Sequence, residues 1–132
     1  MADISLIIDR LYERVTSAIF IAEDAEGRGD LVGARKAYLE VSFLEEDIGS
    51  RLDASDAEGA IARRGAITAA LSADLPERAL DIVHGYLKEE LPAPLNGQLK
   101  LLEAEALSKR PSSELRRLNV RPAARFSLDA VA

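Results

Sequence analysis

Apolar residues recur along this chain at alternating spacings of four and three, which is the period of an α-helix. The clearest run lies near the start of the chain, where one helical face collects Ile4, Ile8, Leu11, Val15, Ala18, Ala22 and Ala25. Strict alternation of apolar and polar residues, the pattern of a half-buried strand, nowhere lasts more than a few residues. The apolar set contains 22 alanines and 19 leucines, which favour helices, but only 6 valines. The sequence therefore predicts an all-α fold.

Turn and capping residues divide the chain into about five predicted helices. Their expected ranges are 3–26, 30–50, 55–73, 74–91 and 95–109. Gly27 is expected as the left-handed C-cap of the first helix, Asp30 as the N-cap of the second, and Ser55 with Glu58 as a capping box. Pro92 and Pro94 are expected to stop the fourth helix. Short turns make consecutive helices antiparallel, so we expect helical hairpins.

The third predicted helix is dominated by small residues, namely Ala57, Gly59, Ala60, Ala62, Gly65, Ala66, Ala69 and Ala70. Small side chains let a second helix backbone approach closely. We therefore expect a neighbouring helix to cover Gly65 and Ala66, with Ile61, Ile67 and Leu71 adding apolar contacts.

Charge divides the chain into an acidic body and a basic tail. Residues 1–108 carry 21 acidic and 11 basic side chains, whereas residues 109–132 carry six basic side chains against two acidic ones. We predict one helical hairpin domain over residues 1–110 and a tail over 111–132 that is partly disordered or forms a short helix at 113–118. The acidic body argues against nucleic acid as a partner.

Cysteine content and hydropathy indicate where in the cell the protein is expected. The chain has no cysteine, which excludes disulfides and thiolate metal sites. No segment reaches the roughly 18 uninterrupted apolar residues of a membrane span. Two aspartates precede the first basic residue, so a secretory n-region is lacking. These features predict a soluble protein in the cytoplasm.

Residues 29–38 can be aligned with residues 73–83, with the two Asp-Leu steps 44 residues apart and one residue inserted. Gly29, Asp30, Ala34 and Tyr38 resemble the turn, small residue and aromatic residue of the second helix of a tetratricopeptide repeat. Ile21 and Ala22 resemble the large-then-small pair of its first helix. The resemblance implies stacked hairpins over residues 15–110, whose first helices line a concave side that binds protein. Ala18 at the tryptophan-type position and the spacing, longer than the family's roughly 34 residues, leave an irregular helical bundle as the alternative.

Few residues suggest catalysis. His84 is the single histidine, and Asp81 three residues before it has no counterpart of the kind that a di-metal bundle requires. Gly27-Arg28-Gly29 lacks the ending of a phosphate-binding loop. We therefore predict no enzymatic activity, no metal site and no cofactor, and we expect His84 to lie half-exposed on the fourth helix.

Several side chains are candidates for a partner-binding surface. Tyr12, Phe20 and Phe43 lie off the regular apolar faces of their helices, so each is either an additional core residue or an exposed anchor. The charged runs Glu45-Glu46-Asp47, Glu89-Glu90, Arg63-Arg64 and Arg116-Arg117 are interpreted mainly as solvated faces. Arg116 and Arg117 belong to the tail, which we expect to dock on a neighbouring molecule or partner and to pair with acidic clusters such as Glu45-Glu46-Asp47.

Two functional hypotheses remain. The first is a protein–protein interaction module, such as an adaptor, a chaperone-like protein or a regulatory subunit, that binds a protein or peptide through its hairpins. The second is a self-associating helical bundle, a homodimer for example, without catalytic activity.

Overall fold

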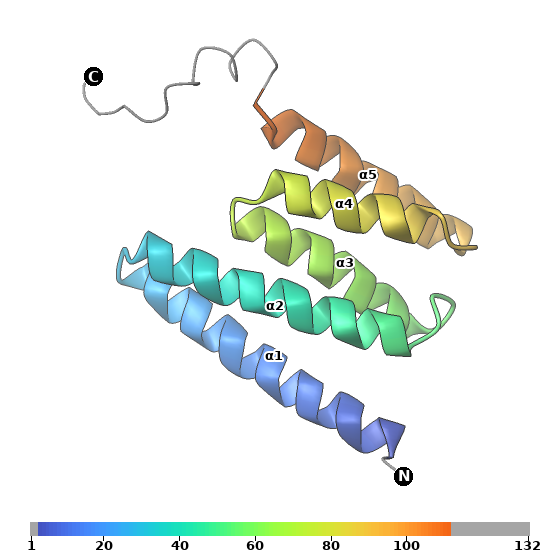
Figure 1. Ribbon diagram of the computed structural model, residues 1–132, viewed down its shortest axis with the longest axis horizontal. Helices are drawn as coiled ribbons and strands as arrows, with labels where there is room; N and C mark the ends of the chain where they lie inside the picture. Colours follow the sequence, from blue (N-terminus) through green and yellow to red (C-terminus); the bar gives the residue numbers. More distant parts are fainter. Residues whose placement is uncertain (1–2, 112–132) are drawn as a thin grey trace.

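The structure, a computed structural model, describes residues 3–111, and within that range it contains five α-helices and no strand. The helices are α1 (Ile4–Gly27), α2 (Leu31–Arg51), α3 (Ala57–Ser72), α4 (Pro76–Leu87) and α5 (Ala93–Lys109). Consecutive helices run antiparallel, so α1 with α2 and α3 with α4 form hairpins (Figure 1). The predicted all-α fold is confirmed, with helix ends shifted by a few residues. The short helix predicted at 113–118 lies outside the described residues.

The helices lie in two layers (Figure 1). α2 and α4 pack over α3 from one side, while α1, α3 and α5 form the other layer. Polar side chains join neighbours within each layer. Arg78 of α4 donates to Glu46 of α2 (Nη2 to Oε1, 2.8 Å), Tyr12 of α1 to Glu58 of α3 (Oη to Oε1, 3.3 Å), and Arg64 of α3 to Gln98 of α5 (Nη1 to Oε1, 2.9 Å).

α3 is the central helix of the packing. One buried cluster joins it to α1 and α2, and α3 contributes Ala62 and Ala69 to that cluster. A second cluster joins α3 to α4 and α5, and here α3 contributes Ala66, Ile67 and Ala70. The same helix therefore forms part of both halves of the core.

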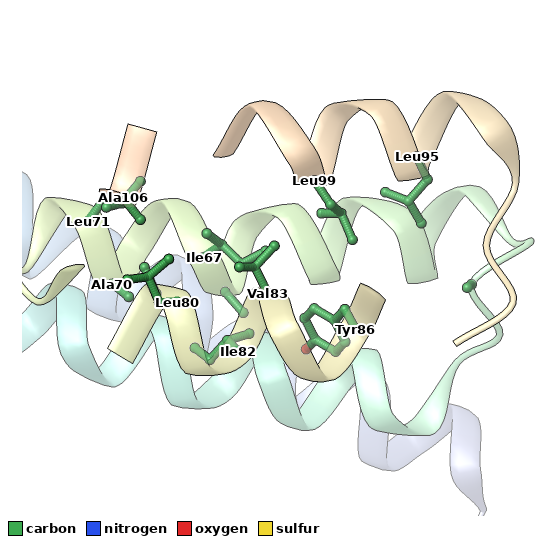
Figure 2. Close-up of a cluster of buried hydrophobic side chains, with 13 residues drawn as sticks. Ile67, Ala70, Leu71, Leu80, Ile82, Val83, Tyr86, Leu95, Leu99 and Ala106 are labelled. Carbon is green, nitrogen blue, oxygen red and sulfur yellow. The ribbon is translucent and has the colours of Figure 1, made fainter. Parts of the chain in front are cut away.

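The second cluster shows how the three later helices meet. Figure 2 shows Ile67, Val83 and Leu99 converging from α3, α4 and α5, and all three are fully buried. Tyr86 closes one end of the cluster. Apolar residues at helical spacing in α4 and α5 form this cluster: Ala79, Val83, Tyr86, Leu95, Leu99 and Ala106 are buried, and Leu87 and Leu102 are half-buried.

The small-residue face of α3 allows α2 to approach closely. Ser42 of α2 is fully buried, and its Oγ donates to the backbone carbonyl of Ala66 (2.7 Å). The same Oγ accepts a hydrogen bond from Nε of Arg78 (3.1 Å). The predicted close packing over Ala66 is therefore confirmed, and one serine links α2, α3 and α4. Ile61 was expected to add to this packing, but it lies exposed on the opposite side of α3.

Two helix ends differ from the sequence prediction in the same way. Gly29, rather than Gly27, takes the left-handed conformation after α1 (φ 77°), and Asp74 takes it after α3 (φ 64°). At each end, backbone N–H groups of this residue and the next donate to carbonyls in the last turn, which is a Schellman motif. Gly29 and Asp74 are therefore equivalent, so the hairpins align at an offset of 45 without the insertion that the Asp-Leu alignment required.

The starts of two helices also correct the prediction. Asp56 is the N-cap of α3 without a side-chain hydrogen bond, and Glu58 accepts from Tyr12, so the predicted capping box does not form. Pro92 is the N-cap of α5 and Pro94 lies in its first turn, where a proline is tolerated because that backbone nitrogen has no helical partner. α4 ends before both prolines, at Leu87.

The packing of α2 on α3 generates a stability prediction. Ala66→Leu should lower the free energy of unfolding by about 1–3 kcal/mol, because α2 leaves no room for the larger side chain. Ala104→Leu on the exposed side of α5 is a matched control and should change it by less than about 0.5 kcal/mol. Urea denaturation measures both, and equal effects would contradict the packing described here.

Candidate functional site

Two pockets open on the layer formed by α1, α3 and α5. The first, here called the α1–α3 pocket, has a volume of about 270 Å³ and is lined by Ile19, Glu23, Tyr38, Val41, Glu45, Gly65, Thr68, Ala69 and Ser72. The second, the α3–α5 pocket, has about 390 Å³ and is lined by Arg64, Thr68, Gln98, Leu101 and Leu102. Thr68 borders both pockets, so they adjoin. Together they are called the first-helix groove below.

Glu45 places a half-buried carboxyl group in the α1–α3 pocket. Burial raises the pKa of its carboxyl group to about 7. Neighbouring Glu46 pairs with Arg78 and Asp47 with Arg51, whereas Glu45 has no hydrogen bond or ion pair with any described residue. The interpretation of this acidic run as a solvated face is therefore wrong for Glu45.

Gly65 makes the room that Glu45 occupies. A Cβ atom at Gly65 would lie 2.5 Å from the Oε2 atom of Glu45, closer than real Cβ contacts allow. The absence of a side chain at this position of α3 thus lets the carboxylate lie against the helix. Gly65 and Glu45 together shape the polar part of the pocket.

Tyr12, the first predicted site residue, lies where α1 meets α3. Its hydroxyl donates to Glu58, and its ring packs against the cluster shared by α1, α2 and α3. Burial, followed by the nearby charges of Glu58 and Glu45, raises the pKa of Tyr12. The side chain is half-buried and belongs to the edge of the core between α1 and α3.

Phe20, the second predicted site residue, lies on the exposed surface of α1. Its side chain is 72% exposed. It follows Ile19 and precedes Glu23 by three residues, and both of those line the α1–α3 pocket. Phe20 therefore lies on the part of α1 that adjoins the groove and is exposed enough to contact a partner.

Phe43, the third predicted site residue, lies in the other layer. The guanidinium group of Arg78 stacks over its ring, 4.0 Å from the centroid. Arg78 comes from α4, so this contact contributes to the packing of α4 on α2. The structure thus does not bring Phe43 together with Tyr12 into one surface. Arg116 and Arg117, the remaining predicted site residues, lie outside the described range.

The interpretation of Arg63-Arg64 as a solvated pair is wrong for Arg63. Its side chain is buried, and it donates to the backbone carbonyl of Gly59 and to Oε1 of Glu89, each at 3.0 Å. Its guanidinium group also lies 5.4 Å from the ring centroid of Tyr86. This arginine joins α3 to the residues after α4, so its role is structural.

His84 lies half-exposed on α4, and its Nε2 atom is 2.9 Å from Oε2 of Glu103 on α5. Within residues 3–111, no three His, Cys, Asp or Glu side chains are grouped so that they could hold a metal ion. No helix in the described part of the chain is long and apolar enough to cross a membrane.

Two further surface hollows differ from the groove in their charge. One, of about 310 Å³, contains Arg14 and Glu40, which pair at 3.6 Å. The other, of about 300 Å³, contains Arg35 and Asp74, which also pair at 3.6 Å. Each hollow thus contains an ion pair beside one further charged residue, Glu13 in the first and Lys36 in the second, whereas the α1–α3 pocket contains two carboxylates and no cation.

Comparison with protein-family models, with curated proteins and with solved structures found no match to this chain. The candidate site therefore depends on its own geometry alone.

The position of Glu45 in the sequence could have indicated its role in the pocket. Val41 and Ile48 are apolar residues at helical spacing in the second predicted helix, and Glu45 falls between them, four residues after Val41 and three before Ile48. A carboxylate in the middle of an apolar stripe marks either a buried partner or a pocket. Nothing comparable marked Thr68 or Leu101, whose role depends on how α3 and α5 lie side by side.

The different surroundings of the two phenylalanines generate a prediction. Phe43→Ala should lower the free energy of unfolding by about 0.5–1 kcal/mol, because the stacked guanidinium of Arg78 loses its ring. Phe20→Ala should change it by less than about 0.5 kcal/mol, because that ring is mostly in solvent. Urea denaturation of both variants tests the assignment, and a larger loss for Phe20→Ala would overturn it.

Proposed function

We propose that this chain is a cytoplasmic protein-interaction module that binds a segment of another protein along the first-helix groove. The observation that carries the proposal is the pair of adjoining pockets that share Thr68. A groove that runs across helices lying side by side suits an extended or helical segment, since successive helices supply contacts at regular intervals.

The side chains around the groove support this proposal. Leu101 of α5 lines the α3–α5 pocket and is 73% exposed, and Ile61 of α3 is also largely exposed. The charged lining residues are Arg64, Glu23 and Glu45, and Tyr38, Thr68, Ser72 and Gln98 add uncharged polar groups. Exposed apolar residues beside polar groups that can fix the orientation of a ligand are typical of recognition surfaces.

We also propose that the hairpins are tetratricopeptide-like. The equivalence of Gly29 and Asp74, at an offset of 45, supports a repeated hairpin. The position of the groove on α1, α3 and α5 agrees with the expectation that first helices line the binding side.

Self-association is the second candidate function, and a different observation favours it. α1 is an edge helix that packs on α2, and its outward side exposes Leu6, Phe20 and Ile21. A second copy that stacked on this side would bury these residues.

Site-specific photo-crosslinking in the source cell tests the proposed function. A benzophenone amino acid at Ile61 or Leu101 should give an adduct with a partner protein, whereas one at Val32, an exposed apolar position on α2, should not. With the purified partner, Leu101→Asp should weaken binding at least about tenfold, equivalent to about 1.4 kcal/mol, and Val32→Asp should not.

Three results would contradict the proposal. These are equal adducts at all positions, no loss of binding in Leu101→Asp, and adducts only between copies of this chain at Phe20 or Ile21. The last result would establish self-association instead.

A further inference from the structure

The α1–α3 pocket carries negative charge without a compensating cation. Glu45 and Glu23 are its charged lining residues, and neither pairs with a described residue. The remaining titratable lining residue is Tyr38, whose hydroxyl donates to Glu26. The charge of Glu45 also contributes to the raised pKa of Tyr12 on α1, and α3 contributes no charged side chain to the lining.

A carboxylate in this position requires a particular kind of ligand. Removing a charge from water is unfavourable unless a counter-charge or hydrogen-bond donors compensate it, and burial already raises the pKa of Glu45. The pocket walls near Glu45 include Ile19, Val41 and Ala69, which are apolar. An arginine side chain fits both features, because its apolar stem packs against such walls while its guanidinium binds a carboxylate.

The end of α5, from which the arginine-bearing residues 112–132 continue, lies on the same side of the molecule as the Ser72 end of this pocket. α5 ends beside the start of α4, where Nε of Arg110 lies 3.8 Å from Oε2 of Glu77. The turn of residues 73–75 joins α4 to Ser72, which lines the pocket, and Figure 1 shows these ends on the same side of the molecule.

Residues 112–132 follow this point. They contain the arginines Arg116, Arg117, Arg121 and Arg125 and the acidic residues Glu114 and Asp129. Arg116 lies six positions after Arg110, and an extended chain over six positions reaches about 20 Å.

We propose that the chain's own tail occupies the α1–α3 pocket, with Arg116 or Arg117 pairing with Glu45. The tail is covalently attached, so its effective concentration at the pocket exceeds that of a tail from a second copy. The pairing itself needs no partner. Its consequence, that a partner must displace the tail to enter the groove, rests on the proposed function.

The pKa of Glu45 in the full chain, measured by NMR of its carboxyl carbon, tests the pairing. Arg116→Gln with Arg117→Gln should raise that pKa by about one to two pH units, because an adjacent guanidinium stabilises the carboxylate. Arg121→Gln with Arg125→Gln removes the same charge from the tail and serves as the matched control, with a smaller rise expected. The same pKa in all three proteins, or equal rises in both variants, would overturn the proposal.

A spin label tests where the tail lies, since the chain has no cysteine of its own. A label at Thr68→Cys, on the groove, should broaden the amide signals of residues 113–119, and Glu45→Gln should restore them. The same label at Ser50→Cys, near the far end of α2, should not broaden them. Absence of broadening from Thr68→Cys would overturn the proposal.

A mixture of two proteins distinguishes the chain's own tail from the tail of a second copy. One protein carries the spin label, and the other is isotope-labelled and, having no cysteine, carries no spin label. Broadening only within one chain supports the proposal, and broadening between chains assigns the pocket to a second copy and overturns it. These experiments use the isolated protein, so their failure leaves the crosslinking test of the proposed function unaffected. Conversely, a docked tail without any partner adduct would refute the proposed function alone.

Discussion

The close approach of α2 to α3 is the interaction on which the rest of the structure depends. α3 carries alanine at positions 62, 66, 69 and 70, so α2 packs on one side of it while α4 and α5 pack on another. Ser42 then reaches the carbonyl of Ala66 and holds Arg78 of α4 at the same point. A larger side chain at the contact would force α2 and α3 apart and destabilise the fold.

The same packing creates the candidate site. Because α2 lies over α3 from one side, the opposite sides of α1, α3 and α5 remain without covering helices, and the pockets lie there. Gly65, part of the small-residue face, leaves space for the carboxylate of Glu45. Glu46 pairs with Arg78 and Glu89 with Arg63, whereas Glu45 has no ion pair among the described residues. The small residues of α3 therefore both allow close helix packing and leave room for the carboxylate in the groove.

The helical periods and the small-residue face could be predicted from the sequence, because both depend on residues close together in the chain. Ile8, Leu11 and Ala22 are buried as their spacing indicated, although Ile4 at the start of the same face is exposed. The residues that sequence reasoning misjudged depend on contacts between distant segments. Glu58 accepts from Tyr12 instead of completing a capping box, and Arg63 is buried by Glu89 and Tyr86. Phe43 and Phe20 looked alike in the sequence, and only the position of Arg78 distinguishes them.

Native-state hydrogen exchange, followed with increasing denaturant, tests most directly whether α3 joins the two halves of the core. If it does, the slowest amides should lie in residues 62–71 and exchange only through global unfolding, together with the amides of α2 and α4 that face them. The contrary result would be a partial opening in which α3, α4 and α5 exchange at a lower free energy while α1 and α2 remain protected. That outcome would show two independent units and would contradict the central position of α3.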